Sequence, residues 1–339
     1  MSKVISDNLR FHYDEELFNN RWESEVDPTS LVLINSGAIV QSETIANLIS
    51  NGGNYYTIPF YKDLTGDPQN YDGKTDIVST DTEDGVQSGV VYGEAKGFKN
   101  TLFVNDFTSA DPMGNIIARI SKYWAKIDQK KIIAILNGIF GITGDAEWAK
   151  HTYDISSAEA EATDENRMGL TTLRDASVKA LGENADNLTL AIMHSTVANR
   201  LENLQVLNFF KYNVGGMELD VRVGRSGNLL VLISDQLPVA DSETATGEKV
   251  YTTYIFGNGA ILTANAPVEK PSDVVYDAKL NGGTEELITR RRKTYHPNGF
   301  TFAMSNMPIS VTETELGTSD NWSRQMLADN INIVRVITN

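Results

Sequence analysis

Apolar side chains recur at steps of three and four residues between positions 111 and 141, which is the spacing of one face of a helix. Asp111 suits the N-cap and Pro112 the first helical position, while Gly138 and Gly141 offer places to stop. The pattern predicts one long amphipathic helix of about 25 residues, roughly 40 Å in length. Its recurring positions are Met113, Ile116, Ile117, Ile120, Tyr123, Trp124, Ile127, Lys131, Ala134 and Ile135.

Shorter patterns on both sides of this helix predict a mixture of strands and helices. Helices are expected at Ser42–Ile49, at Thr171–Leu181 and from a Ser195 cap to about Leu204. A hairpin is expected between Glu285–Tyr295 and Phe300–Met304, around the turn 296–299. Single strands are expected at Val32–Ile34, Tyr55–Tyr61, Gly89–Phe98, Leu188–Met193, Glu218–Val223, Leu229–Ser234, Val250–Phe256, Ala260–Ala264 and Asn332–Ile337.

The segment between the strands at Tyr55–Tyr61 and Gly89–Phe98 is rich in Asp, Gly and Thr and has no clear period. A structureless loop of roughly 25 residues is unusual inside a compact domain. An isolated two-stranded loop is also marginally stable in water. We therefore expect a projecting two-stranded loop that packs on another subunit.

Composition restricts the classes of protein that fit. The chain has 339 residues, 45 acidic and 29 basic side chains, and a formal net charge of −16. This balance argues against a surface that binds nucleic acid throughout, although basic residues cluster locally. The absence of cysteine excludes disulfides, thiolate metal sites and a cysteine nucleophile. We expect no signal peptide at the N-terminus and no membrane span.

Candidate catalytic and metal sites are weak in this sequence. The four histidines, His12, His151, His194 and His296, lack metal-ligand spacing, and His194-Ser195 is better explained by a helix cap than by a catalytic pair. Asn70-Tyr71-Asp72-Gly73 resembles the start of a calcium loop, but Pro68 and Ser79 then occupy the first and twelfth ligand positions. We expect no cofactor, no metal site and no enzymatic activity.

Two basic runs are the more informative charged features. Strand alternation places Arg290 and Arg292 on one face and Arg291 and Lys293 on the other. Either these side chains are solvated or paired on the strand, or they contact acidic residues of a neighbour, such as Asp72 and Asp76 of the loop. Lys62 in the same loop is a further candidate for an intersubunit contact. A second basic stripe could be a solvent-exposed helix face, or it could contact acidic partners or DNA. It consists of Arg119, Lys122, Lys126 and Lys130.

The order of these parts resembles the major capsid protein of tailed bacteriophages, which has the HK97-type fold. The most specific residues run from Arg290 to Phe302, within ITRRRKTYHPNGFTFAMSNMP, with NIVRVIT near the C-terminus. The resemblance covers essentially the whole chain. It implies an α+β fold with an N-terminal arm at 1–50 and an extended loop at 51–105. A peripheral domain with the spine helix follows at 106–184, then an axial domain at 185–267, and 268–339 returns to the peripheral strands and a C-terminal strand.

The resemblance also implies a structural role. Subunits of this family form hexamers and pentamers that close an icosahedral or prolate shell around double-stranded DNA. Implied partners are further copies of the chain, a portal and decoration proteins, in a virion assembled in the host cytoplasm. The start at Met1-Ser2, directly before the arm, leads us to expect a separate scaffold protein. Lys62 and Lys74 lie in the extended loop, but the acceptor of the family's Lys–Asn cross-link is not matched, so that chemistry is not inferred.

Three residues of the spine helix, Ile120, Trp124 and Ile127, are expected to form its core contact with the peripheral strands. Two other interpretations remain open. An encapsulin-type compartment shares the fold but encloses enzymes, and the DNA content of particles separates it from a capsid. A soluble α/β enzyme would require a catalytic constellation that these motifs do not supply.

Overall fold

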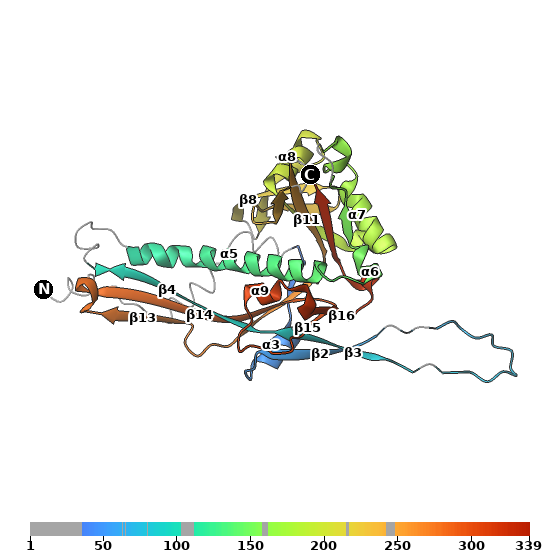
Figure 1. Cartoon of the computed structure of the whole chain (residues 1–339), viewed down its shortest axis with the longest axis horizontal. Coiled ribbons are helices and arrows are strands. Elements are labelled where there is room, and N and C mark those ends of the chain that lie inside the picture. Colours follow the sequence, from blue (N-terminus) through green and yellow to red (C-terminus); the bar gives the residue numbers. More distant parts are fainter. Residues whose placement is uncertain are drawn as a thin grey trace.

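The computed structural model describes residues 36–62, 64, 66–79, 81–102, 112–157, 162–214, 217–241 and 248–339. The expected strand at Val32–Ile34, most of the N-terminal arm and the Asp111 cap lie outside these ranges. The described chain forms two large sheets, of five and eight strands, which are joined by the long helix, and a narrow two-stranded hairpin projects beyond them (Figure 1). It is an α+β architecture, as the resemblance implies.

The long helix α5 spans Pro112–Phe140, close to the predicted range. It continues through Gly138, one of the two glycines expected to end it, and stops at Phe140. A Cβ on Gly138 would lie 2.5 Å from the Leu316 carbonyl oxygen and 2.6 Å from Trp322 Nε1. Gly138 therefore allows close packing against the neighbouring chain and does not end the helix.

The peripheral sheet lies along α5 in Figure 1. Its strand order is β1-β12-β14-β13, and β4 pairs with the other edge of β14. The strands are β1 (Ile39–Gln41), β4 (Tyr92–Thr101), β12 (Ile261–Ala266), β13 (Ser272–Asp277) and β14 (Thr284–Pro297). The short helix α3 (Glu43–Ile49) begins at Ser42, whose Oγ accepts a hydrogen bond from Ile45 N.

The axial sheet has the order β5-β17-β11-β6-β9-β8-β7, with β10 on β11. Helices α7 (Thr172–Leu181) and α8 (Ser195–Asn203) cover one face, and α5 packs on the other. The strands are β5 (Thr152–Asp154), β6 (Leu188–Met193), β7 (Asn208–Val214), β8 (Met217–Ser226), β9 (Leu229–Ile233), β10 (Val239–Asp241), β11 (Lys249–Gly257) and β17 (Ile333–Thr338).

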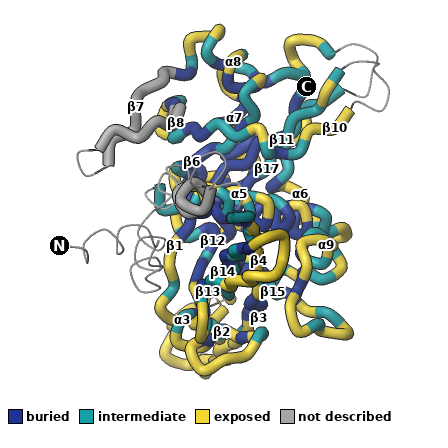
Figure 2. Tube along the Cα trace, turned by 90° about the vertical axis from the view of Figure 1, so that its left-hand side faces the viewer, coloured by how far each residue is buried: buried dark blue, intermediate teal, exposed yellow. Residues whose placement is uncertain are grey.

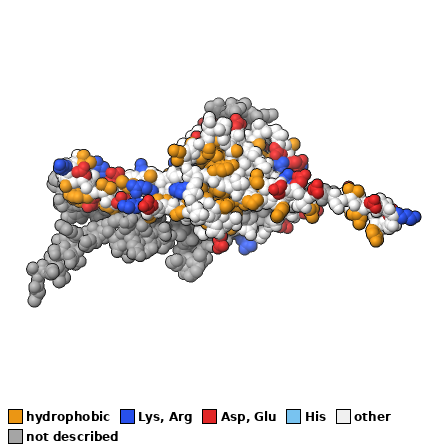
Figure 3. All heavy atoms as spheres, turned by 90° about the horizontal axis from the view of Figure 1, so that it is seen from below, with side chains coloured by type: hydrophobic (Ala, Val, Ile, Leu, Met, Phe, Trp, Pro, Cys, Tyr) orange, Lys and Arg blue, Asp and Glu red, His pale blue; other side chains and the backbone are white. Residues whose placement is uncertain are grey.

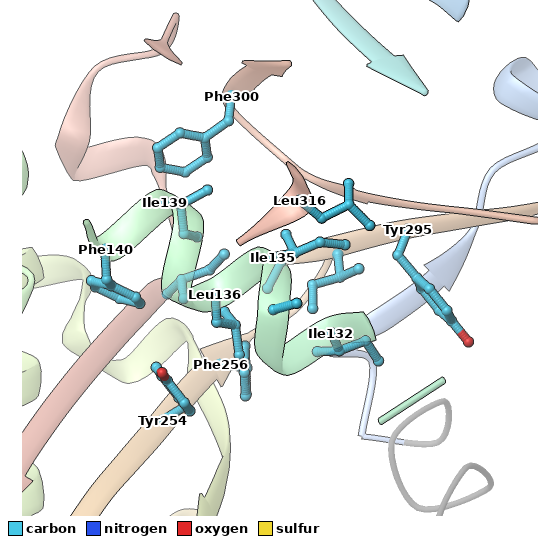
Figure 4. Packing of buried hydrophobic residues seen from close by; sticks show 14 of the residues in the cluster. Ile132, Ile135, Leu136, Ile139, Phe140, Tyr254, Phe256, Tyr295, Phe300 and Leu316 are labelled. Atoms are coloured by element: carbon cyan, nitrogen blue, oxygen red, sulfur yellow. The ribbon is translucent and has the colours of Figure 1, made fainter. Parts of the chain in front are cut away.

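Alternation along the axial strands explains why both faces are buried. On β11, Tyr254 and Phe256 point toward α5, whereas Ile255 points toward α7 and α8. The C-terminal half of α5 supplies Ile132, Ile135, Leu136, Ile139 and Phe140 to this core (Figure 4). Buried residues consequently run through the middle of the molecule, while the outer turns and the hairpin are exposed (Figure 2).

The remaining elements connect the two sheets. Strands β15 (Phe300–Phe302) and β16 (Trp322–Arg324) pair with each other, and helices α6 (Ala146–Ala149) and α9 (Glu313–Leu316) lie near the end of α5. The predicted hairpin between Glu285–Tyr295 and Phe300–Met304 is wrong. Strand β14 pairs with β4, β12 and β13 instead, and β15 pairs with a strand formed 20 residues later.

The structure divides the chain differently from the expected ranges. Strand β5 pairs with β17, and α7 packs on the axial sheet, so these segments lie with the axial part. Strand β12 belongs to the peripheral sheet, and the C-terminal strand β17 belongs to the axial sheet. Sequential order alone does not reveal such crossings, because a strand's partners are chosen by three-dimensional packing.

Candidate assembly surface

The projecting hairpin is the first candidate surface. Strands β2 (Tyr55–Tyr61) and β3 (Asp84–Val90) pair from Tyr55 opposite Val90 to Tyr61 opposite Asp84. The ladder continues one step further, because Lys62 N donates to the Glu83 carbonyl and Lys62 Nζ lies 2.9 Å from the Glu83 carboxylate. The described residues beyond this pair form an extended loop away from the body (Figures 1 and 3).

The loop orders its own tip through Asp72. The Asp72 carboxylate accepts hydrogen bonds from Thr75 N at 2.7 Å, Lys74 N at 2.9 Å and Thr75 Oγ1 at 2.8 Å. These bonds, led by that from the Thr75 backbone, lower the pKa of Asp72 to about 2. Asp72 therefore acts as a turn residue, and neighbouring Asp76 is exposed.

Apolar side chains on this loop are a feature that sequence reasoning missed. The segment is rich in Asp and Gly, which predicts a polar loop. Several of its large apolar side chains are nevertheless exposed to solvent. Single exposed apolar residues are ordinary, whereas contiguous exposed apolar patches mark contact surfaces. The exposed fractions are 85% for Leu64, 88% for Tyr71, 76% for Ile77 and 71% for Val78.

A cluster of five charged side chains lies beneath α5 and joins it to β4 and β14. Arg291 on β14 donates to the Glu94 carboxylate at 2.6 Å, and its Nη2 lies 2.7 Å from Asp128 Oδ1. Lys293 Nζ lies 3.0 Å from Asp128 Oδ2, and Lys131 Nζ lies 3.6 Å from Glu94 Oε1. The five side chains are only 8–20% exposed. They therefore form a largely buried network between three elements.

Aromatic rings complete this cluster. The Arg291 guanidinium lies 4.1 Å from the centre of the Trp124 ring, Lys131 Nζ lies 4.8 Å from the Tyr92 ring, and Lys293 Nζ lies 4.6 Å from the Tyr295 ring. Burial lowers the pKa of Lys293, while the Asp128 carboxylate opposes that shift. Three cations share two carboxylates here, so the rings provide the remaining favourable contacts.

The intersubunit contact expected for Arg291 and Lys293 is therefore corrected, because both side chains bond within their own chain. Arg292, on the opposite face, donates to the Gly53 carbonyl at 2.6 Å and to Asn54 Oδ1 at 2.9 Å, at the base of the hairpin. Arg290 makes one long contact of 3.4 Å with the Lys270 carbonyl. Arg290 remains the member of this run best placed to bind a neighbour.

The two acidic partners of this cluster, Glu94 and Asp128, were not among the residues expected to form a site. Asp128 lies four residues after Trp124, on the apolar side of α5. An acidic residue within an apolar helical stripe is the feature of the sequence that could have predicted this cluster. A buried carboxylate requires a cation beside it. Glu94 lies opposite Arg291 in the β4–β14 register, which only strand pairing could reveal.

The three core residues expected on the spine helix lie together. Ile120 and Trp124 are buried with Leu287 of β14, and Ile127 packs against this group from a partly buried position. The basic stripe of Arg119, Lys122, Lys126 and Lys130 is exposed. The helix thus presents one face to the peripheral sheet and a positively charged face to its surroundings.

His12 lies outside the described residues, and the described histidines occupy structural positions. His194, and not Ser195, is the N-cap of α8, with its Nδ1 accepting a hydrogen bond from Thr196 N. Among the described residues, no group of three His, Asp or Glu side chains is arranged to hold a metal ion. Within the same ranges, no helix has the length and apolar character needed to cross a membrane.

Comparison with known proteins gives consistent results. The chain is 29% identical over 287 residues to the major capsid protein of Bacillus phage SPP1, covering 84% of this chain and 83% of that protein. The capsid of Ralstonia phage GP4 matches the structure with a TM-score of 0.58 at 12% identity over 90% of each chain. No protein-family model matches the chain.

A second solved structure supports the same fold. The Cyanophage Pam1 capsid matches with a TM-score of 0.52 at 11% identity, covering 89% of this chain and 90% of that chain. Both solved structures are phage capsids, and their likeness to this chain extends to the α+β fold. The chain is therefore a major capsid protein of the tailed-bacteriophage type, with the HK97-like fold.

Proposed function

We propose that copies of this chain associate into hexamers and pentamers, which close an icosahedral or prolate head around double-stranded DNA. The observation that carries this proposal is the similarity to a phage major capsid protein across 84% of the chain. The projecting hairpin supports it, because the hairpin places large apolar side chains beyond the body of the subunit.

The hairpin supplies a physical route to assembly. Each large apolar side chain that becomes fully buried on a neighbour contributes about 1.5–3 kcal/mol. Leu64, Tyr71, Ile77 and Val78 are available for such burial. Ordering the loop and losing translational freedom offset part of this gain. Many such contacts repeated around a closed shell hold it together by avidity, even where a single contact is weak.

The basic stripe on α5 is our candidate for contact with packaged DNA. Arg119, Lys122, Lys126 and Lys130 are exposed on one helix face, whereas the chain as a whole carries a net charge of −16. A local cationic face on an acidic subunit favours phosphate contacts that are weak, independent of sequence and sensitive to salt. A scaffold protein, a portal and decoration proteins are the further partners of this proposal, with assembly in the host cytoplasm.

An encapsulin-type shell is the alternative function, and the similarity to a phage major capsid protein favours the capsid. Co-expression of the chain with the candidate scaffold protein of the same genome, followed by electron microscopy, tests the proposal. We expect closed shells built from six-fold and five-fold clusters. Particles from infected cells should contain nuclease-protected double-stranded DNA. Particles filled with enzyme and free of DNA would contradict the capsid assignment, and a chain that stays monomeric with every scaffold candidate would contradict assembly.

A further inference from the structure

The root of the projecting hairpin is attached to the body by buried polar side chains. Gln87 on β3 is 4% exposed, and its Oε1 lies 3.1 Å from His296 Nε2 and 3.0 Å from Gly299 N. His296 lies near the end of β14 and is 1% exposed. One amide oxygen thus joins the hairpin to both β14 and the turn that follows it.

The geometry defines the tautomer of His296. Gly299 N–H is a donor, so the Gln87 atom that it meets must be the amide oxygen. That oxygen can only accept from His296, so His296 Nε2 carries the proton in the neutral ring. Nδ1 is then unprotonated, and it has no hydrogen-bond partner among the described residues.

Neighbouring contacts hold the same root in place. Tyr56 on β2 donates to Thr294 Oγ1 at 2.8 Å, and Thr294 donates to the Val90 carbonyl at 2.7 Å. A Cβ on Gly89 would lie 2.9 Å from His296 Nδ1, so backbone covers the unprotonated nitrogen closely. Additional bonds join Ser88 N and the Val86 carbonyl to Thr301 Oγ1 on β15.

The surroundings of His296 contain little that could stabilise a positive charge. Tyr56 of β2 is the titratable group that faces the ring, with ring centres 6.0 Å apart, and burial raises its pKa, so it stays neutral. Strand β3 contributes Gln87 and Gly89 to these surroundings, and β12 places Leu262 opposite His296. Among the described residues, none of these elements presents a carboxylate to the imidazole.

We propose that His296 and Gln87 form a pH-sensitive latch, in which protonation of His296 at Nδ1 opens the buried root and lets the hairpin change direction. An imidazolium at this position would hold an N–H with no acceptor, in a closed setting that offers no carboxylate to balance its charge. Water can reach that N–H only if β3 separates from β14. Burial lowers the pKa of His296 to about 4, which keeps the latch closed at neutral pH.

In an assembled shell, the direction of the hairpin would decide which neighbouring subunit it contacts. This consequence of the latch rests on the proposed function. The latch itself is a property of the single subunit. A measurement on unassembled protein therefore tests the latch separately from assembly, and failure of one does not imply failure of the other.

The absence of cysteine from the chain makes the experiment direct. Asp84→Cys at the distal end of β3 and Thr314→Cys on α9 give two exposed labelling sites, one on the hairpin and one on the body. Nitroxide labels at both sites report the hairpin-to-body distance distribution by pulsed electron paramagnetic resonance. Samples are compared between pH 7.5 and pH 4, with far-ultraviolet circular dichroism as the control for a folded body.

Two variants at one position separate the latch from general acid effects. In the otherwise unchanged labelled chain we expect a narrow distribution at pH 7.5 that broadens with a midpoint near pH 4. Gln87→Leu removes the hydrogen-bond acceptor of His296, so its distance distribution should be broad at every pH. Gln87→Glu supplies a carboxylate to the imidazolium, so the distance distribution of this variant should remain narrow at pH 4.

Two results would overturn the proposal. One is a Gln87→Leu distribution as narrow as that of the unchanged chain at pH 7.5. The other is equal acid broadening in the unchanged chain and in Gln87→Glu. The comparison at pH 7.5 remains decisive even where acid unfolds the body.

Discussion

On β14, successive residues point to opposite faces of the sheet. The face decides whether a basic side chain joins the buried ionic cluster or points away from α5. Arg291 and Lys293 face α5 and bond to Asp128, whereas Arg290 and Arg292 face away. Removing one member of a buried ionic network leaves its partners uncompensated, which is costlier than the net value of the pair. The same substitution therefore has different effects at adjacent positions.

Arg291→Ala should lower the free energy of unfolding of the unassembled subunit by about 3–5 kcal/mol, because Glu94 and Asp128 lose their shared cation. Arg290→Ala, one position away, should change it by less than about 0.5 kcal/mol. Urea unfolding of both variants measures the difference. Equal stability of the two would show that the cluster contributes little to folding.

His151 provides a pH dependence whose sign follows from its burial. Its Nδ1–H donates to the Ile333 carbonyl at 2.8 Å, and burial lowers its pKa below the ordinary value of 6.5. The folded state thus favours the neutral ring. The resulting stabilisation is complete above pH 6.5 and is lost as the pH falls through 6.5 toward the lowered value.

We expect His151→Gln to flatten part of this decline. Urea unfolding of the unassembled subunit at pH 7 and pH 5 should show a smaller loss of stability in the variant than in the unchanged chain. A variant whose stability falls with pH as steeply as that of the unchanged chain would place His151 in a more hydrated setting than the structure shows.

At the scale of elements, α5 is the part that connects both sheets. Its N-terminal half contributes Ile120 and Trp124 to the peripheral sheet, and its C-terminal half contributes Ile135 and Ile139 to the axial core. Its exposed stripe takes part in neither contact. The two faces of the helix therefore separate folding from the proposed contacts with other molecules.

Trp124→Ala should lower the free energy of unfolding by roughly 3–5 kcal/mol, because the indole is 5% exposed and packs against Leu287 and Arg291. Lys126→Ala, on the exposed face of the same helix, is the matched control and should be nearly neutral. Thermal and urea unfolding of unassembled subunits measures both. A Trp124→Ala subunit that melts like the unchanged chain would contradict the assigned orientation of α5.

For the whole molecule, the hairpin is separable from the body beyond its root. Lys62 and Glu83 form the last described pair of the ladder, so a tight turn can join them without disturbing β2 or β3. The apolar side chains proposed for neighbour contact all lie beyond that pair. Shortening the hairpin there should affect assembly and spare the fold.

Replacing residues 63–82 by Asn-Gly, which favours a two-residue hairpin turn, tests this separation. We expect a folded subunit with a free energy of unfolding within about 1 kcal/mol of the original, but few or no stable shells. Urea unfolding and electron microscopy of co-expressed particles provide the two measurements. Normal shells from the shortened chain would assign assembly to other surfaces, and an unfolded chain would show that the loop supports the body.

The spine helix, strand β2 of the hairpin and the strands Leu188–Met193 and Leu229–Ile233 could be predicted from the sequence, because local periodicity and turn residues determine them. The expected strand at Gly89–Phe98 falls mostly on β4, whereas β3 lies almost entirely in the segment that was expected to be a loop. The resemblance carried by the residues from Arg290 to Phe302 also gave the correct fold. Only the tertiary structure decided that β14 pairs with β4, β12 and β13, and that β17 joins the axial sheet. These pairings bring together residues far apart in the chain, such as Glu94, Asp128 and Arg291, or Gln87 and His296. Periodicity assigns a side chain to a face, but the opposite charge or hydrogen-bond partner on the facing element is set by how the elements pack.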